Sequence, residues 1–409
     1  MLTRLKVQNY KSLRDIDIGL NPLTVFVGPN NAGKSNILDC LNFLKELAET
    51  SGGPAVESRG GFRDIVWNGD LKRSIQIELD AVVSIAGDSK EVFNYQLGLS
   101  GGPTHFTLER EILQRVWTMG TGGWIPDWVA RKLKSKAVAG RPGERITEVL
   151  LTKLEDNQVQ ISIEGEVELA YLRYGNQLSL LQIPVLFQFP EKYRPITSFV
   201  REINGWAFYE FVPQKMREPN TARRELKVNR EGENISAVIH SLQSEFGERF
   251  EEIADLLKSG IPEVRRLFTR LTEQGKTYVS LEEKGLSLSI PAWAISEGTL
   301  RLLAHLAIVS SPEAPTLACF EEPENCIHPH LLELVVDVLK SSSKRMQVLI
   351  TTHSPYLLNL VRNPESLIVV EKGEGETVCK PVKDEGVKEA LQVLGLGELW
   401  YSGNVGGVP

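Results

Sequence analysis

Apolar side chains at alternate positions open the chain and predict an antiparallel hairpin. Leu5, Val7 and Tyr10 face one way, and Ile16 and Ile18 continue the pattern after a polar turn. The run 23–27 is apolar except for Thr24, which is typical of a fully buried strand, and an amphipathic helix is expected to follow it through Leu47. Further strands are predicted at 74–85, 92–99, 104–113 and 159–163.

The second half of the chain mixes helical and extended patterns. A short helix is predicted over 195–204 and a strand over 206–212. A longer helical stretch is expected over 233–257, because apolar residues recur there at helical spacing. Strands are predicted at 264–271 and 277–290, and from 296 onward helix and strand alternate. That alternation is typical of a parallel sheet, so we expect an α/β fold.

Composition narrows the class of protein. The 409 residues carry 46 Lys+Arg against 53 Asp+Glu, a net charge of −7, and 42% hydrophobic residues, which excludes a disordered or collagen-like chain. No apolar run approaches the ~20 residues of a membrane span, so no membrane association is expected. The four cysteines form no C-x-x-C pair and favour a reducing, cytoplasmic location. The length allows two or three domains, or one large domain with insertions.

The segment 117–145 is irregular and locally basic, and we interpret it as an insertion or flexible loop. Its basic residues are Arg131, Lys132, Lys134, Lys136, Arg141 and Arg145. The acidic overall balance argues against a globally basic DNA-binding protein. A local basic groove stays compatible with it, because affinity for DNA follows local charge.

A phosphate-binding pattern follows the apolar strand. Gly28 to Ser35 reads G-x-x-x-x-G-K-S and precedes a predicted helix. Glycines let backbone N–H groups surround phosphate oxygens, and the helix N-terminus favours an anion. Lys34 can place its charge on the β- and γ-phosphates, and Ser35 can offer its hydroxyl to Mg²⁺. For Asn31, a polar contact and simple turn chemistry are equally compatible with the pattern.

An acidic segment follows a second apolar strand. Residues 317–320 run into Glu321, Glu322, Pro323 and Glu324. In α/β folds the carboxyl ends of strands carry the chemistry, so one carboxylate can hold Mg²⁺ through water and the next can polarise an attacking water. Most of the chain separates this segment from Lys34, which predicts an ATPase split by a large insertion.

Two further positions have candidate chemistry. Ser296 and Gly298 begin an apolar helix and can present free N–H groups to an anion, although Ser296 can equally be an ordinary N-cap. His353 follows the apolar strand 348–352, and at the end of the strand after an acidic one it is a candidate for sensing a γ-phosphate.

Four motifs in this order resemble the ABC-type ATPase heads of the RecF, SMC/Rad50 and OLD group. They read GPNNAGKS, SEGTLRLL, LACFEEPENCIHP and LITTHSP, and the opening LKVQNYKSLR is similar to the first hairpin of those heads. The resemblance implies an ABC-type P-loop head with a mixed or parallel core sheet, an N-terminal antiparallel sheet and an inserted α/β region. We therefore expect an ATPase lobe at 1–112, an inserted lobe at 113–285 and a second ATPase lobe at 286–409.

The resemblance implies roles position by position. Glu321 matches the Walker B acid that holds Mg²⁺, Glu322 the catalytic glutamate and His353 the switch histidine. Asn325 and His328 fall in the D-loop region, and Ser296 and Gly298 match the signature motif that meets the ATP of an opposite subunit. The implied nucleotide contacts of the phosphate loop are Gly28, Asn30, Asn31, Gly33, Lys34, Ser35 and Asn36. The implied mechanism is closure of two heads on two nucleotides, followed by hydrolysis that reopens them.

The departures from the family pattern shape the expected partners. Walker B carries Glu321 where the wider superfamily has Asp, SEGT replaces the transporter signature, and no glutamine marks the Q-loop. The pattern predicts no long coiled-coil arm and no Cys hook. Glu371 ends a Val-rich strand, but no D-x-D follows it, so the nuclease domain that OLD chains carry is not expected here.

The resemblance therefore implies a stand-alone ATPase, a homodimer or higher homo-oligomer, that regulates a separate TOPRIM-like nuclease in antiphage or mobile-element defence. A RecF-like ATPase that binds DNA directly is the alternative, and a regulatory ATP-binding protein with little turnover is a third. The segment 394–409 is expected to expose Trp400 and Tyr401 as a docking tail, or else to pack as an ordinary terminus.

Overall fold

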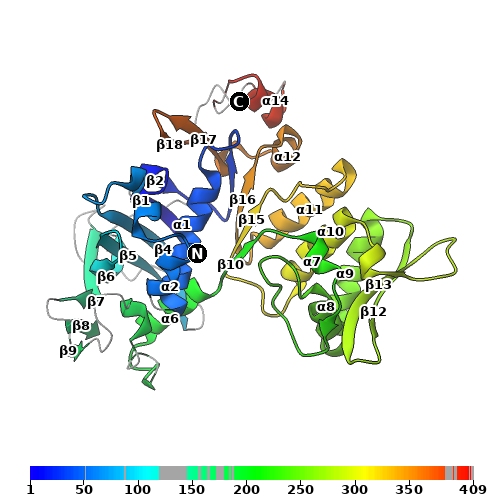
Figure 1. Cartoon of the computed structure of the whole chain (residues 1–409), viewed down its shortest axis with the longest axis horizontal. Helices are drawn as coiled ribbons and strands as arrows, with labels where there is room; N and C mark the ends of the chain where they lie inside the picture. The colour runs from blue at the N-terminus through cyan, green and yellow to red at the C-terminus, as the bar shows by residue number, and fades with distance from the viewer. Residues whose placement is uncertain are drawn as a thin grey trace. The chain divides into compact units, whose positions relative to one another are not determined.

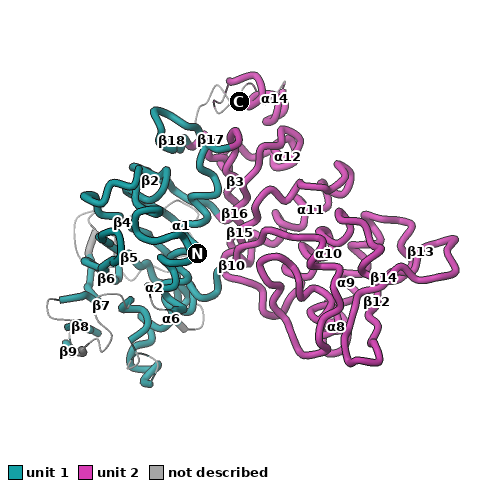
Figure 2. The backbone as a smooth tube through the Cα atoms, viewed as in Figure 1, with its two compact units in different colours: residues 1–21, 31–206, 370–380 teal, residues 22–30, 207–369, 381–409 magenta. Residues whose placement is uncertain are grey.

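The computed structural model describes residues 1–50, 52–86, 89–118, 145–154, 158–163, 166–171, 179–183, 186, 188–382, 390, 394–404 and 406. The chain forms two interleaved units, drawn in teal and magenta in Figure 2. Unit 1 comprises 1–21, 31–206 and 370–380, and unit 2 comprises 22–30, 207–369 and 381–409. Of the predicted basic insertion, 119–144 lies outside the described residues. The three-lobe division at 112 and 285 stays a prediction.

Unit 1 is built on an eight-stranded antiparallel sheet with the order β2-β1-β4-β5-β6-β7-β8-β9 (Figure 1). The predicted hairpin is confirmed, because Leu5 pairs with Ile18 and Val7 with Ile16. The strands are β1 Leu2–Tyr10, β2 Leu13–Gly19, β4 Ile75–Ala86, β5 Ser89–Gly101, β6 Phe106–Thr118, β7 Arg145–Lys153, β8 Gln158–Ile163 and β9 Glu166–Tyr171.

Helices complete unit 1, and α1 (Lys34–Glu49) is the one that carries the phosphate loop at its start. Its buried face includes Ile37, Leu41 and Phe43, and the helix packs against α6 (Arg194–Asn204), which in turn packs on β4. Shorter elements are α2 Gly52–Glu57, α3 Phe62–Ile65, η1 Trp67–Gly69 and η3 Leu180–Gln182. Strand β18 (Glu376–Pro381) brings the late segment 370–380 back into this unit.

Unit 2 contains the predicted parallel sheet. Its strands β15 (Leu317–Glu321), β16 (Gln347–Thr352), β3 (Leu23–Val27) and β17 (Leu367–Gly373) are neighbours in that order, and the three pairings are parallel. Strand β10 (Trp206–Tyr209) lies beside β15. Both faces of β3 and β16 are buried, which explains why neither strand alternates between apolar and polar residues.

Helices and a small second sheet complete unit 2. The small sheet joins β11 Asn220–Thr221, β12 Val264–Leu271, β13 Lys276–Glu283 and β14 Ile290–Pro291. The helices are α7 Pro213–Met216, α8 Ile235–Glu245, α9 Gly247–Gly260, α10 Glu297–Ser310, α11 Pro329–Ser342, α12 Pro355–Val361 and α14 Leu396–Tyr401, with η4 at Ala292–Ala294 and η5 at Pro364–Ser366. Among the described residues, no helix has both the length and the apolar character to cross a membrane.

Three predicted elements are shorter or broken in the structure. The helical stretch 233–257 is two helices, because Phe246 leaves the helical region (φ −132°, ψ 57°) and Gly247 starts α9. The strand predicted over 206–212 ends at Tyr209, and Pro213 begins α7 soon after. The strand predicted over 277–290 ends at Glu283, where a turn with Gly285 at φ +83° precedes β14.

The expected exposure of Trp400 is wrong. Trp400 is 2% exposed and joins Leu396 and Leu399 in the apolar core of unit 2, whereas Tyr401 is 70% exposed. The three buried residues lie on one face of α14, which packs against α12. Packing of this face against α12 buries the indole, so the described part of the tail resembles an ordinary packed terminus.

Candidate functional site

The phosphate loop joins β3 to α1 and depends on a glycine at the helix start. Gly33 is the N-cap of α1 with φ +104°, a left-handed conformation that glycine adopts without steric cost. Its carbonyl oxygen accepts hydrogen bonds from the N–H groups of Asn36 and Ile37. Because the cap residue has no side chain, none competes with an anion for the first N–H groups of the helix.

The residues of this loop fit a phosphate group. Lys34 is buried, with 7% of its surface exposed, and it is the first residue of α1, where the helix N-terminus favours an anion. Asn31 also has a positive φ, 64°, as turn chemistry requires, and its polar contact with a nucleotide stays a prediction.

The acidic segment places Glu322 in a constrained conformation directly after β15. Glu322 has φ +45°, which is uncommon for a residue with a side chain and costs about 1–3 kcal/mol where the surroundings enforce it. Its N–H donates to the carbonyl oxygen of Thr351 at 2.9 Å, and its own carbonyl accepts from the N–H of Asn325 at 3.0 Å. These bonds fix the backbone and therefore the direction of the carboxylate.

Two side chains hold the Glu322 carboxylate itself. The amide of Asn325 donates to Oε2 at 2.9 Å, and Nδ1 of His353 lies 2.9 Å from Oε1. A carboxylate only accepts, so Nδ1 carries the hydrogen in this pair. His353 and Glu322 stay partly exposed, at 43% and 29% of their side chains, so both are accessible to a substrate.

Strand register brings the predicted residues to one edge of the parallel sheet. Val27, the last residue of β3, pairs with Thr352, and Thr351 pairs with Glu321. The residues that follow each strand are therefore delivered to the same carboxyl edge, where α/β folds bind ligands. They are Gly28 after β3, Glu322 after β15 and His353 after β16. Glu321 ends β15 and lies 3.9 Å from the guanidinium of Arg230.

Glu324 is a member of this group to which the sequence assigned no role. Its Oε1 accepts from the hydroxyl of Thr352 and from the N–H of His353, the latter at 3.4 Å. Its Oε2 is buried and has no partner among the described residues. Burial raises the pKa of the Glu324 carboxyl, although the bond from Thr352 opposes the shift. Glu324 thus links the acidic loop to the end of β16, and only the fold reveals that contact.

The signature residues lie at the start of α10. Ser296 is the N-cap, and its Oγ accepts from the N–H of Thr299 at 3.2 Å, so the ordinary capping role holds in the isolated chain. A Cβ on Gly298 would lie 2.8 Å from the carbonyl oxygen of Cys326, which requires glycine there. Gly298 therefore packs against the loop that follows Glu322. His328, from the same loop, caps α11 by accepting from the N–H of His330 at 3.3 Å.

The residues fit Mg²⁺ held jointly with a nucleotide rather than by protein alone. The described part of the chain contains no cluster of three His, Cys, Asp or Glu residues able to hold a metal ion. Magnesium needs no such cluster, because it is usually bound by one or two protein groups together with substrate phosphates and water. Ser35 and Glu321 are the protein groups that the sequence proposed for it.

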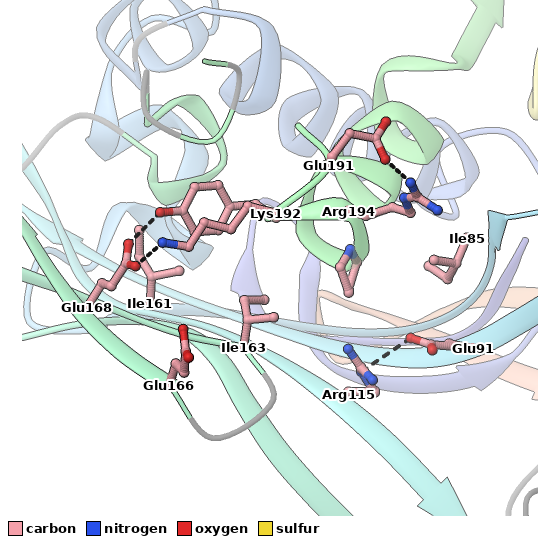
Figure 3. A pocket seen from close by; sticks show the side chains of 12 residues that line it. Ile85, Glu91, Arg115, Ile161, Ile163, Glu166, Glu168, Glu191, Lys192 and Arg194 are labelled. Carbon is pink, nitrogen blue, oxygen red and sulfur yellow. Dashed lines mark hydrogen bonds and ion pairs between the residues drawn. The ribbon is translucent and has the colours of Figure 1, made fainter. Parts of the chain in front are cut away.

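A separate hollow of about 560 Å³ lies in unit 1 and contains none of these residues (Figure 3). Its basic side chains each face a carboxylate, and the pairs are Arg115 with Glu91, Lys192 with Glu168 and Arg194 with Glu191. Because each basic side chain already has a carboxylate partner and Glu166 adds a further acidic group to the lining, we do not assign the hollow to nucleotide binding.

Comparisons with known proteins agree with this geometry. A family model described as "AAA domain, putative AbiEii toxin, Type IV TA system" matches residues 127–359, more than half of the chain. A second model, described as "AAA ATPase domain", matches residues 1–99. The chain is 14% identical to a solved SMC head bound to the C-winged helix domain of ScpA, with a TM-score of 0.54 over 94% of this chain and 99% of that one, which shows a shared fold.

Two curated relatives match over shorter regions. An OLD nuclease from Thermus scotoductus is 32% identical over 126 residues, which is 31% of this chain and 22% of the relative. The DNA replication and repair protein RecF from Corynebacterium jeikeium is 40% identical over 48 residues, 12% of this chain and 11% of the relative. The matched regions thus span a small part of either relative. The SMC head shares the fold, the OLD nuclease and RecF matches are local similarities, and the model over more than half of the chain shows that this chain belongs to the AAA-domain family of that description.

Proposed function

We propose that this chain binds ATP with Mg²⁺ and hydrolyses it to ADP and phosphate. The observation that carries the proposal is the Glu322 carboxylate, held by Asn325 and His353 at the carboxyl edge of a parallel sheet. A carboxylate fixed in this way can orient a water molecule and accept its proton.

The other residues have roles that follow from their chemistry. The phosphate loop binds the phosphates through its backbone N–H groups and Lys34. Mg²⁺, when bound, neutralises charge on the phosphate oxygens, and Ser35 and Glu321 would hold it. His353 uses Nδ1 to orient Glu322, which leaves Nε2 for a contact with the terminal phosphate.

We infer that two copies close on the nucleotides. Ser296 is exposed at the start of the 14-residue helix α10, so the first turn of that helix is open to an anion from a second copy. Such closure would make nucleotide binding and assembly interdependent, with a homodimer as the smallest unit.

The OLD-like match supports a further step, in which the ATPase regulates a separate nuclease-type effector in antiphage or mobile-element defence. The four described cysteines are free thiols, which suits the cytoplasmic location proposed for this role. The alternative, supported by the RecF match, is an ATPase that binds DNA directly. A titration of DNA binding against salt distinguishes the two proposals. A protein that binds DNA phosphates directly loses affinity steeply as salt rises, whereas the effector-regulating ATPase should not bind DNA without its partner.

Phosphate release from ATP by the full chain, with and without Mg²⁺, tests the ATPase proposal. We expect Mg²⁺-dependent turnover by the wild type and its loss in Lys34→Ala. The matched control is Lys45→Ala, on the same helix, where the ion pair to Glu49 is exposed and contributes little. The proposal is wrong if the wild type releases no phosphate, or if Lys34→Ala turns over like Lys45→Ala.

A further inference from the structure

Thr377, far along the chain in β18, contacts the phosphate loop within unit 1. Its hydroxyl donates to the carbonyl oxygen of Ala32 at 3.0 Å, and its side chain fills the space beside Gly33. A Cβ built on Gly33 would lie 2.0 Å from Oγ1 of Thr377 and 2.8 Å from Oγ of Ser12. Thr377 is 2% exposed, so this contact is shielded from water.

The number of available donor hydrogens determines which hydroxyl donates in the contact between Ser12 and Thr377. Thr377 has one hydroxyl hydrogen, and Ala32 receives it, so Ser12 must donate in the 2.6 Å contact between the two hydroxyls. Oγ of Ser12 then accepts from the side-chain amide of Asn36, also at 2.6 Å. The hydrogen bonds run from Asn36 through Ser12 and Thr377 to Ala32, and so join both sides of the Lys34–Ser35 dipeptide.

The bond to Ala32 fixes one peptide plane of the loop. In a trans peptide the C=O and the following N–H point in opposite directions, so holding the carbonyl of Ala32 toward Thr377 turns the N–H of Gly33 away from β18. Glycine at φ +104° has no side chain to resist rotation of this peptide. Without the hydroxyl of Thr377, the carbonyl of a residue that is 1% exposed would lose this partner and the plane could turn.

The strand itself does not depend on this hydroxyl. The N–H of Thr377 donates to the carbonyl oxygen of Ser12 at 2.8 Å, and Glu376 pairs with Arg14 at 3.2 Å. These two contacts keep β18 beside the β1–β2 turn when the hydroxyl is removed. The hydroxyl contact to the loop is therefore separable from the docking of the strand.

We propose that Ser12 and Thr377 are positioning residues that orient the Ala32–Gly33 peptide for phosphate binding without touching the nucleotide. This inference rests on the proposed nucleotide binding by the loop. In the same proposal Asn36 helps to hold Ser12 in place, because its side-chain amide donates to Oγ of Ser12.

Titration of the full chain with a fluorescent ATP analogue and Mg²⁺, together with steady-state ATPase kinetics, tests the inference. Thr377→Val keeps the shape but removes the hydroxyl, and we expect Kd and KM to rise about tenfold while kcat changes less than about threefold. Thr377→Ser keeps the hydroxyl and should stay within about twofold of the wild type. Lys380→Gln, on the same strand, breaks an ion pair to Glu371 that plays no part in docking β18 on the β1–β2 turn, and it is the matched control.

Equal losses in Thr377→Val and Thr377→Ser, or wild-type affinity in a folded Thr377→Val, would overturn the inference. If Thr377→Val fails to fold, Ser12→Ala is the variant that tests the inference. We expect its Kd for the ATP analogue to rise about threefold, and an unchanged Kd would contradict the inference. Absence of binding by the wild type would instead overturn the proposed function, and this inference with it.

Discussion

Oε1 of Glu322 and Nδ1 of His353 lie 2.9 Å apart, although 31 positions separate the two residues in the sequence. The parallel pairing of β15 with β16 brings them together, and Glu322 has a positive φ at the point where it leaves β15. The pair has the form of a positioned base and its orienting partner. Substitution of either residue should therefore reveal its contribution to ATP turnover.

Replacement of His353 by Ala should reduce ATP turnover by about 10²-fold and weaken nucleotide binding less, by about tenfold at most. The imidazole orients Glu322 and makes one proposed contact with the terminal phosphate, whereas the phosphate loop supplies the other phosphate contacts. The measurement is kcat for phosphate release beside Kd for an ATP analogue. His330→Ala is the control, since His330 is exposed and only its backbone contacts His328. Similar kcat values for the two variants would remove His353 from the mechanism.

Gly298→Ala should destabilise the chain by about 1–3 kcal/mol, because the new methyl group would meet the carbonyl oxygen of Cys326 at 2.8 Å. Gly247→Ala, at the start of α9, is the matched control: no atom lies within 4 Å of its added Cβ, and alanine favours helix by about 0.5–1 kcal/mol. Denaturant unfolding of both variants provides the comparison. Equal denaturation midpoints for the two variants would show that the loop at Cys326 accommodates the added methyl group with no loss of stability.

Acid stability should depend on His305, which is buried between Phe211 and Phe320 in unit 2. Burial lowers its pKa from 6.5 to about 4. Between pH 6.5 and 4, His305 is protonated in the unfolded chain but neutral in the folded chain. The free energy of unfolding therefore falls as the pH drops from 6.5 toward 4, by roughly 3 kcal/mol in total.

His305→Phe removes this group and should flatten the acid side of the stability curve, measured by denaturant unfolding at several pH values. His105→Gln, an exposed histidine, is the control and should keep the wild-type slope. If His305→Phe loses stability with acid as steeply as the wild type does, the buried histidine does not supply the dependence.

Local patterns in the sequence predicted the elements that depend on neighbouring residues. The apolar run 23–27 and the glycines that follow it are sufficient for a buried strand and a turn into a helix, and the structure confirms both. The alternation after residue 296 likewise predicted the parallel strands β15 and β16. Each of these signals comes from residues within a few positions of one another, so it is visible without the fold.

Features that depend on distant contacts could not be predicted. The bond from Thr352 to Glu324 requires the pairing of two strands, and the approach of Thr377 to Ala32 joins residues 345 positions apart. The burial of Trp400 required the position of α12, which packs on α14. In each case tertiary contacts outweighed the local pattern.

The most direct test of the central claim is ATP hydrolysis by Glu322→Gln. Glutamine keeps the size of the side chain and can still accept one of the two hydrogen bonds from Asn325 and His353, but it cannot accept a proton from water. We predict unchanged affinity for an ATP analogue, a fall in kcat of at least about 10²-fold, and a dimer that persists in ATP because hydrolysis no longer opens it. Hydrolysis at the wild-type rate by this variant would contradict the account.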